Sequence, residues 1–186
     1  DERGRTWVGK TSLGDVELAP GGELLLVVNL EDRRIHRVAL ADGTVVGSFP
    51  HGASGEPWAE DARPFGLGVR GDWVFHGVVN SAYTTREAAD LSAHVYRSRL
   101  DGSEMREVAR FPLDYDRGRQ KAWQAWPQND DRGFRTQEYP HPLLSDIAFD
   151  HAGNLIVGLR DRWVDTGPSL TEFYRVASGD VLRLTP

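Results

Sequence analysis

Short apolar stretches separated by turn residues recur along the whole chain. Residues 13–30 align with residues 144–161 without a gap, and residues 65–81 match both with one deletion at the turn. Alternating segments with an arginine at the same place follow at 34–40, 94–100 and 172–178. This self-similarity predicts repeated copies of one supersecondary unit.

Each copy has the pattern of a meander of four antiparallel strands. In the first copy the strands are expected at 15–19, 24–29, 34–40 and 44–49. Glycine-containing turns, such as the one at Asp42-Gly43, separate them. We expect Val16 and Leu18 to share one face of the first strand. The second strand is apolar throughout and is expected to be buried on both faces.

The predicted fold class is all-β, because helical periodicity is not sustained anywhere. Repeated four-stranded antiparallel units are typical of the blades of a β-propeller, in which each sheet packs both faces against its neighbours. Residues 1–186 are interpreted as a single partial propeller, with blades at about 8–50, 62–113 and 143–186 and a long loop at 114–142. Propellers have about four to eight blades. We therefore expect a propeller fragment whose remaining blades are missing from this chain.

The segment LLLVVNLEDRRIHRVALADGTVVGSF at 24–49, followed by ARPFGLGV at 62–69, resembles the YVTN family of bacterial propeller repeats. Together with PHPLLSDIAFDHAGNLIVGLRDR and SGDVLRL, these segments are similar to the propeller region of large secreted bacterial surface proteins. Proteins of that group often carry SdrD B-like domains, and this chain has none. The resemblance implies a secreted or cell-surface location and a binding or scaffold role. It does not imply any catalysed reaction.

Strand direction places all the long connections on one side of the predicted propeller. These connections, at 51–63, 81–93, 114–142 and 161–171, contain many aromatic residues. Long loops in compact domains are often functional, and aromatic rings anchor protein partners or stack on sugars. The candidate ligand-binding residues are Trp58, Tyr83, Trp123, Trp126, Tyr139 and Trp163. In the alternative interpretation the rings fold inward and hold the loops on the blades.

Polar residues lie where the first strand of a copy begins or where its second strand ends. If the first strand of each copy is innermost, these residues lie near the mouth of the central channel. The candidates at this channel mouth are Asp15, Asn29, Asn80, Asp146 and Asp161. Carboxylate and amide oxygens could hold Ca²⁺ there, or these side chains could simply cap loop backbone. No metal ligand and no cofactor is assigned from the sequence. A Ca-dependent hydrolase or lactonase-like propeller is the alternative function, by analogy of fold alone.

The composition argues against some classes of partner. The formal net charge is −6 and the basic residues are not massed, which argues against nucleic acid. No apolar run approaches the roughly 20 residues of a membrane-spanning helix, so no membrane insertion is expected from this segment. No signal peptide is present in it. The six histidines are scattered, the chain has no cysteine, and no G-x-S-x-G motif occurs, so no catalytic residue is assigned.

GRTWVGKT at 4–11 satisfies the phosphate-loop pattern G-x-x-x-x-G-K-[ST]. A phosphate loop needs a strand before it and a helix after it, and here a strand is expected to follow. We therefore expect no nucleotide. The leading hypothesis is a non-catalytic binding or scaffold propeller that recognises a glycan or a protein at the cell surface through its aromatic loops.

Overall fold

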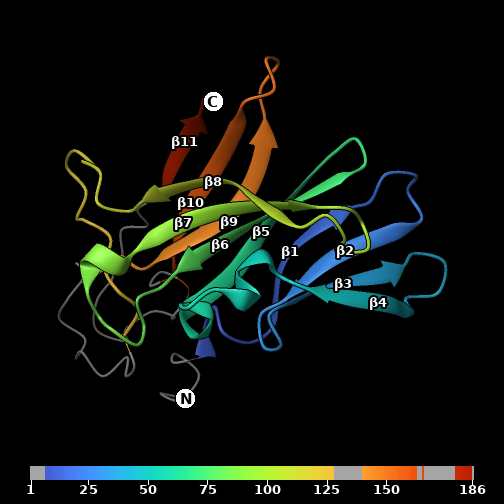
Figure 1. Ribbon diagram of the computed structural model, residues 1–186, viewed down its shortest axis with the longest axis horizontal. Coiled ribbons are helices and arrows are strands. Elements are labelled where there is room, and N and C mark those ends of the chain that lie inside the picture. Colours follow the sequence, from blue (N-terminus) through green and yellow to red (C-terminus); the bar gives the residue numbers. More distant parts are fainter. Residues whose placement is uncertain (1–6, 128–139, 163–164, 166–178, 186) are drawn as a thin grey trace.

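The computed structural model describes residues 7–127, 140–162, 165 and 179–185. In these residues it has eleven strands and three short 3-10 helices (Figure 1). The all-β prediction is therefore confirmed, in the form of three antiparallel sheets with four, four and three strands. No helix within the described ranges is long and apolar enough to cross a membrane.

The first sheet contains β1 (Leu13–Leu18), β2 (Leu24–Asn29), β3 (Arg34–Ala39) and β4 (Val45–Pro50), hydrogen-bonded in that order. The bounds of β2 match the predicted strand at 24–29, and the other three differ by one or two residues. Gly43 has a φ of 74°, the left-handed conformation that the tight β3–β4 turn needs.

The second sheet repeats this topology with longer strands: β5 (Ala62–Arg70), β6 (Trp73–Asn80), β7 (Ser92–Ser98) and β8 (Arg106–Pro112). The connection from β4 to β5 contains η1 (Gly52–Gly55) and η2 (Ala59–Asp61), and η3 (Ala88–Asp90) precedes β7. All of these helices are a single short turn, as expected for connecting segments.

The third sheet contains β9 (Pro142–Phe149), β10 (Leu155–Asp161) and β11 (Asp180–Leu184), in the order β11-β10-β9. Its described part has three strands, whereas four were predicted. β11 pairs directly with β10, from Leu155 opposite Leu184 to Leu159 opposite Asp180. β11 therefore occupies the position next to β10 that was predicted for a strand at 172–178. Residues 172–178 themselves lie outside the described residues.

The three sheets stack through two apolar cores. One core joins the first sheet to the second and contains Leu26, Val28, Ile35 and Phe49 on one side, with Leu67 and Val74 on the other. The other core joins the second sheet to the third and contains Val79, Val95, Leu144, Ile147 and Val157. The second sheet is therefore covered on both faces, as the prediction required.

The outer face of the first sheet differs from that prediction. Leu18, Leu25, Val38 and Val45 lie opposite one another across β1 to β4, so they share this face. Leu18 and Val45 are 52% and 56% exposed, and Val16 on the same face of β1 is 44% exposed. Only the inward face of this sheet packs against another sheet, because the described residues provide no layer on its outer side.

The inner strands β1, β5 and β9 lie side by side because glycine removes side chains between them. A Cβ at Gly66 would lie 2.7 Å from the Asp146 nitrogen and 2.8 Å from the Leu144 oxygen, both backbone atoms of β9. A Cβ at Gly14 would lie 3.1 Å from the Phe65 oxygen of β5. At Gly66 the distance between β5 and β9 is thus set by backbone contact, which leaves no flexible atom to move aside.

Gly66→Ala is expected to destabilise the protein by about 1 to 3 kcal/mol, because its methyl group would force β5 and β9 apart. The measurement is urea unfolding followed by circular dichroism. Gly55→Ala is the matched control, since no atom lies within 4 Å of the added Cβ there. Equal stability of the two variants would show that the strands separate without cost.

Candidate functional site

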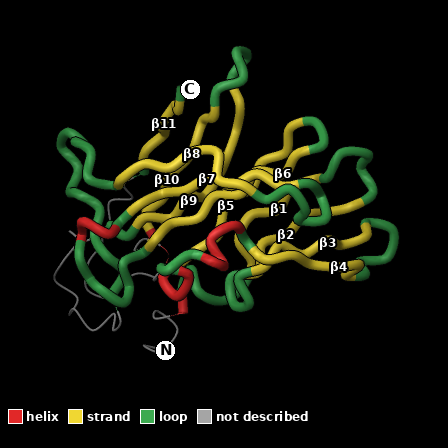
Figure 2. Tube along the Cα trace, viewed as in Figure 1, coloured by secondary structure: helices red, strands yellow, loops and turns green. Residues whose placement is uncertain are grey.

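The longer connections gather on one side of the molecule, which we call the loop face. It is formed by residues 7–12, 30–33, 51–61, 81–91 and 113–127. In Figure 2 it extends from the left to the lower centre, and the three 3-10 helices belong to it. Hairpin turns occupy the opposite side. The predicted separation of long connections from short turns is therefore present in the described chain.

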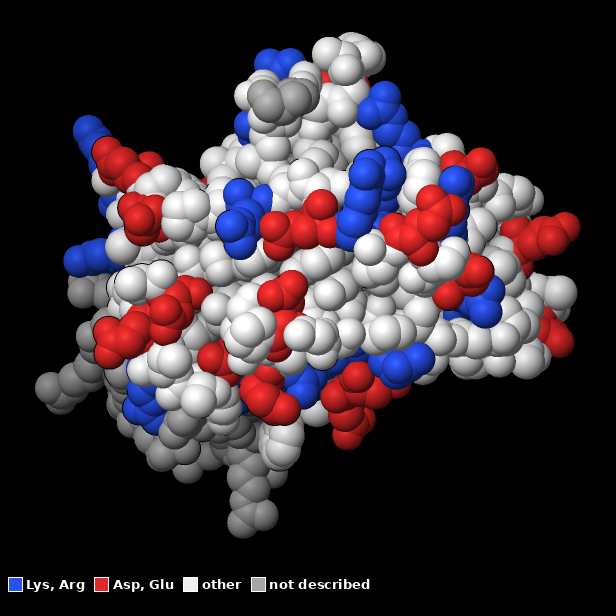
Figure 3. Space-filling view, in the orientation of Figure 1, with Lys and Arg blue, Asp and Glu red and all other residues white. Residues whose placement is uncertain are grey.

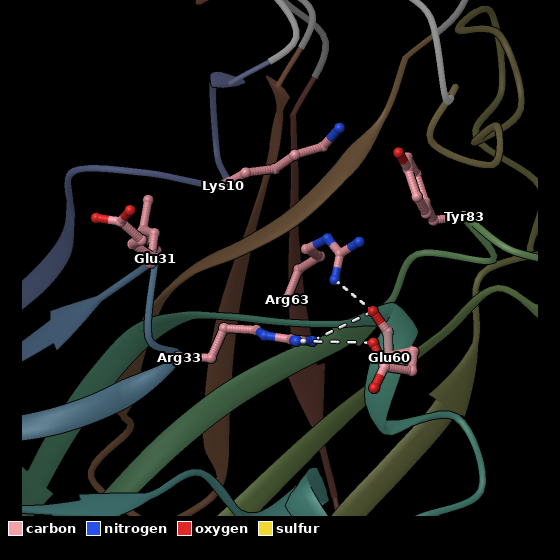
Figure 4. A pocket seen from close by; sticks show the side chains of 7 residues that line it. Lys10, Glu31, Arg33, Glu60, Arg63 and Tyr83 are labelled. Atoms are coloured by element: carbon pink, nitrogen blue, oxygen red, sulfur yellow. Dashed lines mark hydrogen bonds and ion pairs between the residues drawn. The ribbon is translucent and has the colours of Figure 1, made fainter.

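A pocket of about 260 Å³ opens on the loop face. It is lined by Lys10, Leu30, Glu31, Arg33, Glu60, Arg63 and Tyr83, and we call it the loop-face pocket. Figure 4 shows Arg33 and Arg63 reaching towards Glu60 from separate segments, while Lys10 extends towards Tyr83. A second hollow of about 250 Å³ adjoins it and shares Arg33 and Glu60.

Backbone carbonyl groups of η2 and its flanks hold both arginines in place. Arg33 Nη1 donates to the Ala59 oxygen at 2.9 Å and to the Glu60 oxygen at 3.2 Å. Arg63 Nη1 donates to the same Glu60 oxygen at 2.9 Å and to the Ala62 oxygen at 2.8 Å. Two guanidinium groups from different sheets thus meet at one carbonyl oxygen.

The turn that carries Arg33 is strained. Arg33 has a φ of 58°, the left-handed conformation, which costs a non-glycine residue roughly 1–2 kcal/mol. Asn29 Oδ1 accepts from the Glu31 nitrogen at 2.9 Å and supports the same turn. This backbone, with the carbonyl contacts of the guanidinium, aims Arg33 at the pocket.

Tyr83 is fixed by a buried carboxylate on the neighbouring connection. Asp61 is 5% exposed, and its oxygens accept from the Thr84 nitrogen at 3.0 Å and from the Thr84 hydroxyl at 2.6 Å. The Asp61 carbonyl oxygen also accepts from the Ser81 nitrogen at 3.0 Å. These bonds anchor the backbone on both sides of Tyr83, and Lys10 Nζ lies 4.5 Å from the centroid of its ring.

Positive charge acts on the titratable groups around the pocket. Burial, with the nearby charge of Arg33, lowers the pKa of Arg63 to about 10. Burial also lowers the pKa of His51 to about 4, with Arg33 and Arg63 lowering it further. On the face that Figure 3 presents, groups of both signs intermingle. The pocket lining also contains both signs, with Lys10, Arg33 and Arg63 beside Glu31 and Glu60.

Two of the predicted ligand-binding aromatics are buried. Trp123 is 1% exposed and its Nε1 donates to the Tyr115 hydroxyl at 3.1 Å. Trp126 is fully buried and its Nε1 donates to the Pro142 oxygen at 3.0 Å. These rings fold inward and hold the 113–127 segment on the sheets, so neither can stack on a ligand without rearrangement.

The other four aromatic candidates differ among themselves. Tyr83 lines the pocket, whereas Trp58 is half-buried and packs on His94 with ring centroids 4.4 Å apart. Tyr139 and Trp163 lie outside the described residues. Tyr83 is therefore the aromatic candidate that the structure brings to a pocket with charged groups.

Three of the polar candidates at the predicted channel mouth cap backbone. Asn29 Oδ1 accepts from Glu31, Asn80 Oδ1 accepts from the Ala82 nitrogen at 3.1 Å, and Asp161 Oδ1 accepts from the His141 nitrogen at 2.9 Å. Asn29 and Asn80 each close a turn after the end of their own strand, whereas Asp161 holds the start of the neighbouring strand β9. This is the structural role that short polar residues commonly play at such positions.

Asp15 and Asp146 instead come together, with Glu17 as a third member. One carboxylate oxygen from each of the three lies within 4.8 Å of the others, and we call this group the acidic cluster. Asp15 also accepts from the Leu67 nitrogen at 2.9 Å, which ties β1 to β5. Burial raises the pKa of both Asp15 and Glu17, and the charge of Asp146 raises each further. Clustered oxygen ligands of this kind suit Ca²⁺ chemically.

Sequence reasoning did not select Glu17, Arg33 or Arg63. The alternation of β1 gives a signal for Glu17, because residues two apart in a strand share a face and Asp15 was already a candidate. Arg33 and Arg63 stood at predicted loop-side ends of strands, but their convergence depends on the packing of one sheet on another. Lys10 belongs to the GRTWVGKT segment, and it lines the loop-face pocket.

Glu17→Gln is expected to raise the free energy of unfolding at neutral pH by less than about 1 kcal/mol, since it removes a partly exposed repelling charge. A raised pKa in the folded protein means that stability falls as the pH rises and Glu17 ionises. The gain in unfolding free energy should therefore vanish at a pH below the ordinary pKa of a glutamate, where the Glu17 side chain is as neutral as the glutamine.

Urea unfolding near neutral pH and at acid pH, with a chelator present, measures this difference. Glu23→Gln is the control, because Glu23 is an exposed glutamate outside the cluster. A gain of the same size at both pH values would contradict the role of charge repulsion.

Comparisons with known proteins do not identify a family or a function for this chain. No family model, no curated protein and no solved structure matches the chain.

Proposed function

We propose that this chain is part of a non-catalytic binding propeller of a secreted or cell-surface bacterial protein, and that the loop-face pocket contacts its ligand. The YVTN-type resemblance of the repeats supports the location and the propeller. The pocket, with charged groups beside a fixed aromatic ring, is the observation that carries the binding role. Its expected ligand is a glycan or a protein at the cell surface.

The stacking of the sheets supports the propeller interpretation. Successive sheets pack face to face, and their first strands β1, β5 and β9 lie side by side, as inner strands do around a propeller axis. The outer face of the first sheet is apolar and exposed at Val16, Leu18 and Val45. A further blade packed there would remove this apolar surface from water, as the first sheet does for the second.

Tyr83→Ala is expected to weaken ligand binding about tenfold, because the ring is a fixed anchor of the pocket. Tyr83→Phe is the matched control and should bind as the unmodified protein does, since it retains the ring. A glycan array identifies bound glycans, and calorimetry then gives Kd for each variant. Full binding by Tyr83→Ala, or no glycan bound at all, would contradict the proposed role of the pocket in glycan recognition.

A Ca-dependent hydrolase or lactonase-like propeller is the second candidate, favoured by the convergence of the acidic cluster. This alternative requires Asp15 and Asp146 to approach one point, and their carboxylates do so with that of Glu17. The cluster also lies on inner strands, near the expected channel. Its carboxylates would hold the ion through oxygen ligands.

If the cluster binds Ca²⁺, an ion concentration tenfold above Kd should stabilise the protein by about 1.4 kcal/mol and raise Tm by a few degrees. Asp146→Asn should abolish this increase, because it removes one of the three carboxylates. Differential scanning calorimetry with and without calcium provides the measurement. An unchanged Tm for the unmodified protein would remove the support for this candidate.

A further inference from the structure

We infer that residues 51–58, which we call the latch segment, detach from the second sheet when the pH falls below about 6 and His51 and His76 take up protons. The latch segment contains η1 and begins the connection from β4 to β5. The same connection continues into η2, whose carbonyl groups hold the two arginines of the loop-face pocket. Release of ligand at acid pH is the functional consequence, and that part rests on the proposed function.

The first observation is a hydrogen bond that only a neutral histidine can accept. The Gly52 nitrogen donates to His76 Nε2 at 3.2 Å, so Nε2 is the nitrogen without a proton. Protonation would turn Nε2 into a donor facing the Gly52 N–H group. His76 is 1% exposed and stacks on Tyr96 with ring planes 12° apart, so its charged form would lack both an acceptor and water. The closed latch segment therefore requires neutral His76.

The second observation is that nothing compensates a charge on either imidazole. His51 and His76 are both buried, and the Nδ1 atoms of both rings have no hydrogen-bond partner. Neither histidine forms an ion pair with a described residue. Burial, with the nearby charge of His51, lowers the pKa of His76 to about 3, and His51 has a pKa of about 4 for the causes given above. Exposure to water restores the ordinary pKa, so acid favours the open state.

The groups that face His76 from β7 and β8 do not offset its charge. Burial raises the pKa of Tyr96, so this phenol stays neutral over the pH range concerned. The carboxylate of Glu107 accepts from His94 Nδ1 at 2.8 Å, and His94 thus has the acidic partner that His76 lacks. Glu56, which follows η1, is exposed to solvent.

The groups that face His51 include more cations than free carboxylates. His51 shares the second hollow with the charged residues Asp32, Arg33, Arg34 and Glu60. The charges of Arg33 and of Arg63 on β5 both disfavour a proton on His51. The Asp32 carboxylate binds His36 Nε2 at 2.7 Å, and that of Glu60 is exposed and lies 4.0 Å from Arg33. Protonated His51 would therefore stand among positive groups.

The third observation is that little else holds the latch segment. Its fully buried side chain is Ala53, which packs in a small cluster with Ala62, Val78 and Tyr96. Segments with few buried apolar contacts open locally at a smaller cost than the whole fold. Asp61 ends the connection and is bound to Thr84 through its carboxylate, independently of both histidines. We therefore expect the opening to stop before Asp61 and to loosen the carbonyl groups of η2.

Hydrogen exchange read by mass spectrometry, between about pH 7.5 and about pH 5, tests the inference. Rates are expressed as protection factors, which removes the direct effect of pH on amide exchange. At about pH 5 each histidine should favour the open state by about thirtyfold, because its pKa returns to about 6.5 on opening. We expect the protection of residues 51–58 to fall by about a hundredfold or more, while amides of β6 and β7 keep theirs.

His76→Gln and His51→Gln each remove one titrating group, and glutamine at position 76 retains an oxygen that can accept from the Gly52 nitrogen. Each variant should reduce the acid effect on the latch segment about thirtyfold. His151→Gln is the matched control, because His151 is exposed in the turn between β9 and β10, and it should leave the acid effect unchanged. The Tm at neutral pH shows whether each variant is folded, and His51→Gln suffices if His76→Gln is not.

The outcomes separate the latch from the proposed function. Constant protection of residues 51–58 down to about pH 5 would overturn the inference, and so would a loss in step with β6, which would mean global unfolding. An undiminished acid effect in the folded glutamine variants would overturn the role of the histidines. These measurements use no ligand, so an array without a bound glycan would contradict the proposed function and leave the latch intact. Equal glycan affinity at both pH values, with the latch open at the lower one, would overturn the link between latch and pocket.

Discussion

Backbone contact between the inner strands determines the rest of the structure. At Gly66 the strand β5 approaches β9 so closely that no side chain fits between them. This spacing fixes how the sheets stack, and the stacking fixes which loops meet. The acidic cluster forms because β1 and β9 both lie against β5, and the loop-face pocket forms because the first sheet lies against the second.

The pocket illustrates how separate layers combine to make a site. Arg33 comes from a turn of the first sheet and Arg63 from the first strand of the second, and both bind the backbone around η2. Tyr83 comes from the next connection and is anchored by Asp61. None of these segments contains the site alone, and a shift between the two sheets would separate its charged groups.

Much of the fold could be predicted from the sequence, because its signals are local. The apolar run at 24–29 gave the bounds of β2, and turn glycines such as Gly43 separated the strands. The repeat could not predict that β11 pairs with β10, since pairing partners depend on tertiary contacts. Burial of Trp123 and Trp126 was likewise undetermined, because an aromatic residue in a loop suits an exposed anchor and an inward clamp equally. The proximity of Arg33 to Arg63 could not be predicted, because it depends on how the first sheet packs on the second.

A crystal structure of the protein with a bound glycan, chosen from those that the array identifies, tests the central claim most directly. We expect the glycan in the loop-face pocket, with one sugar ring against Tyr83. A glycan bound elsewhere on the protein would contradict this expectation.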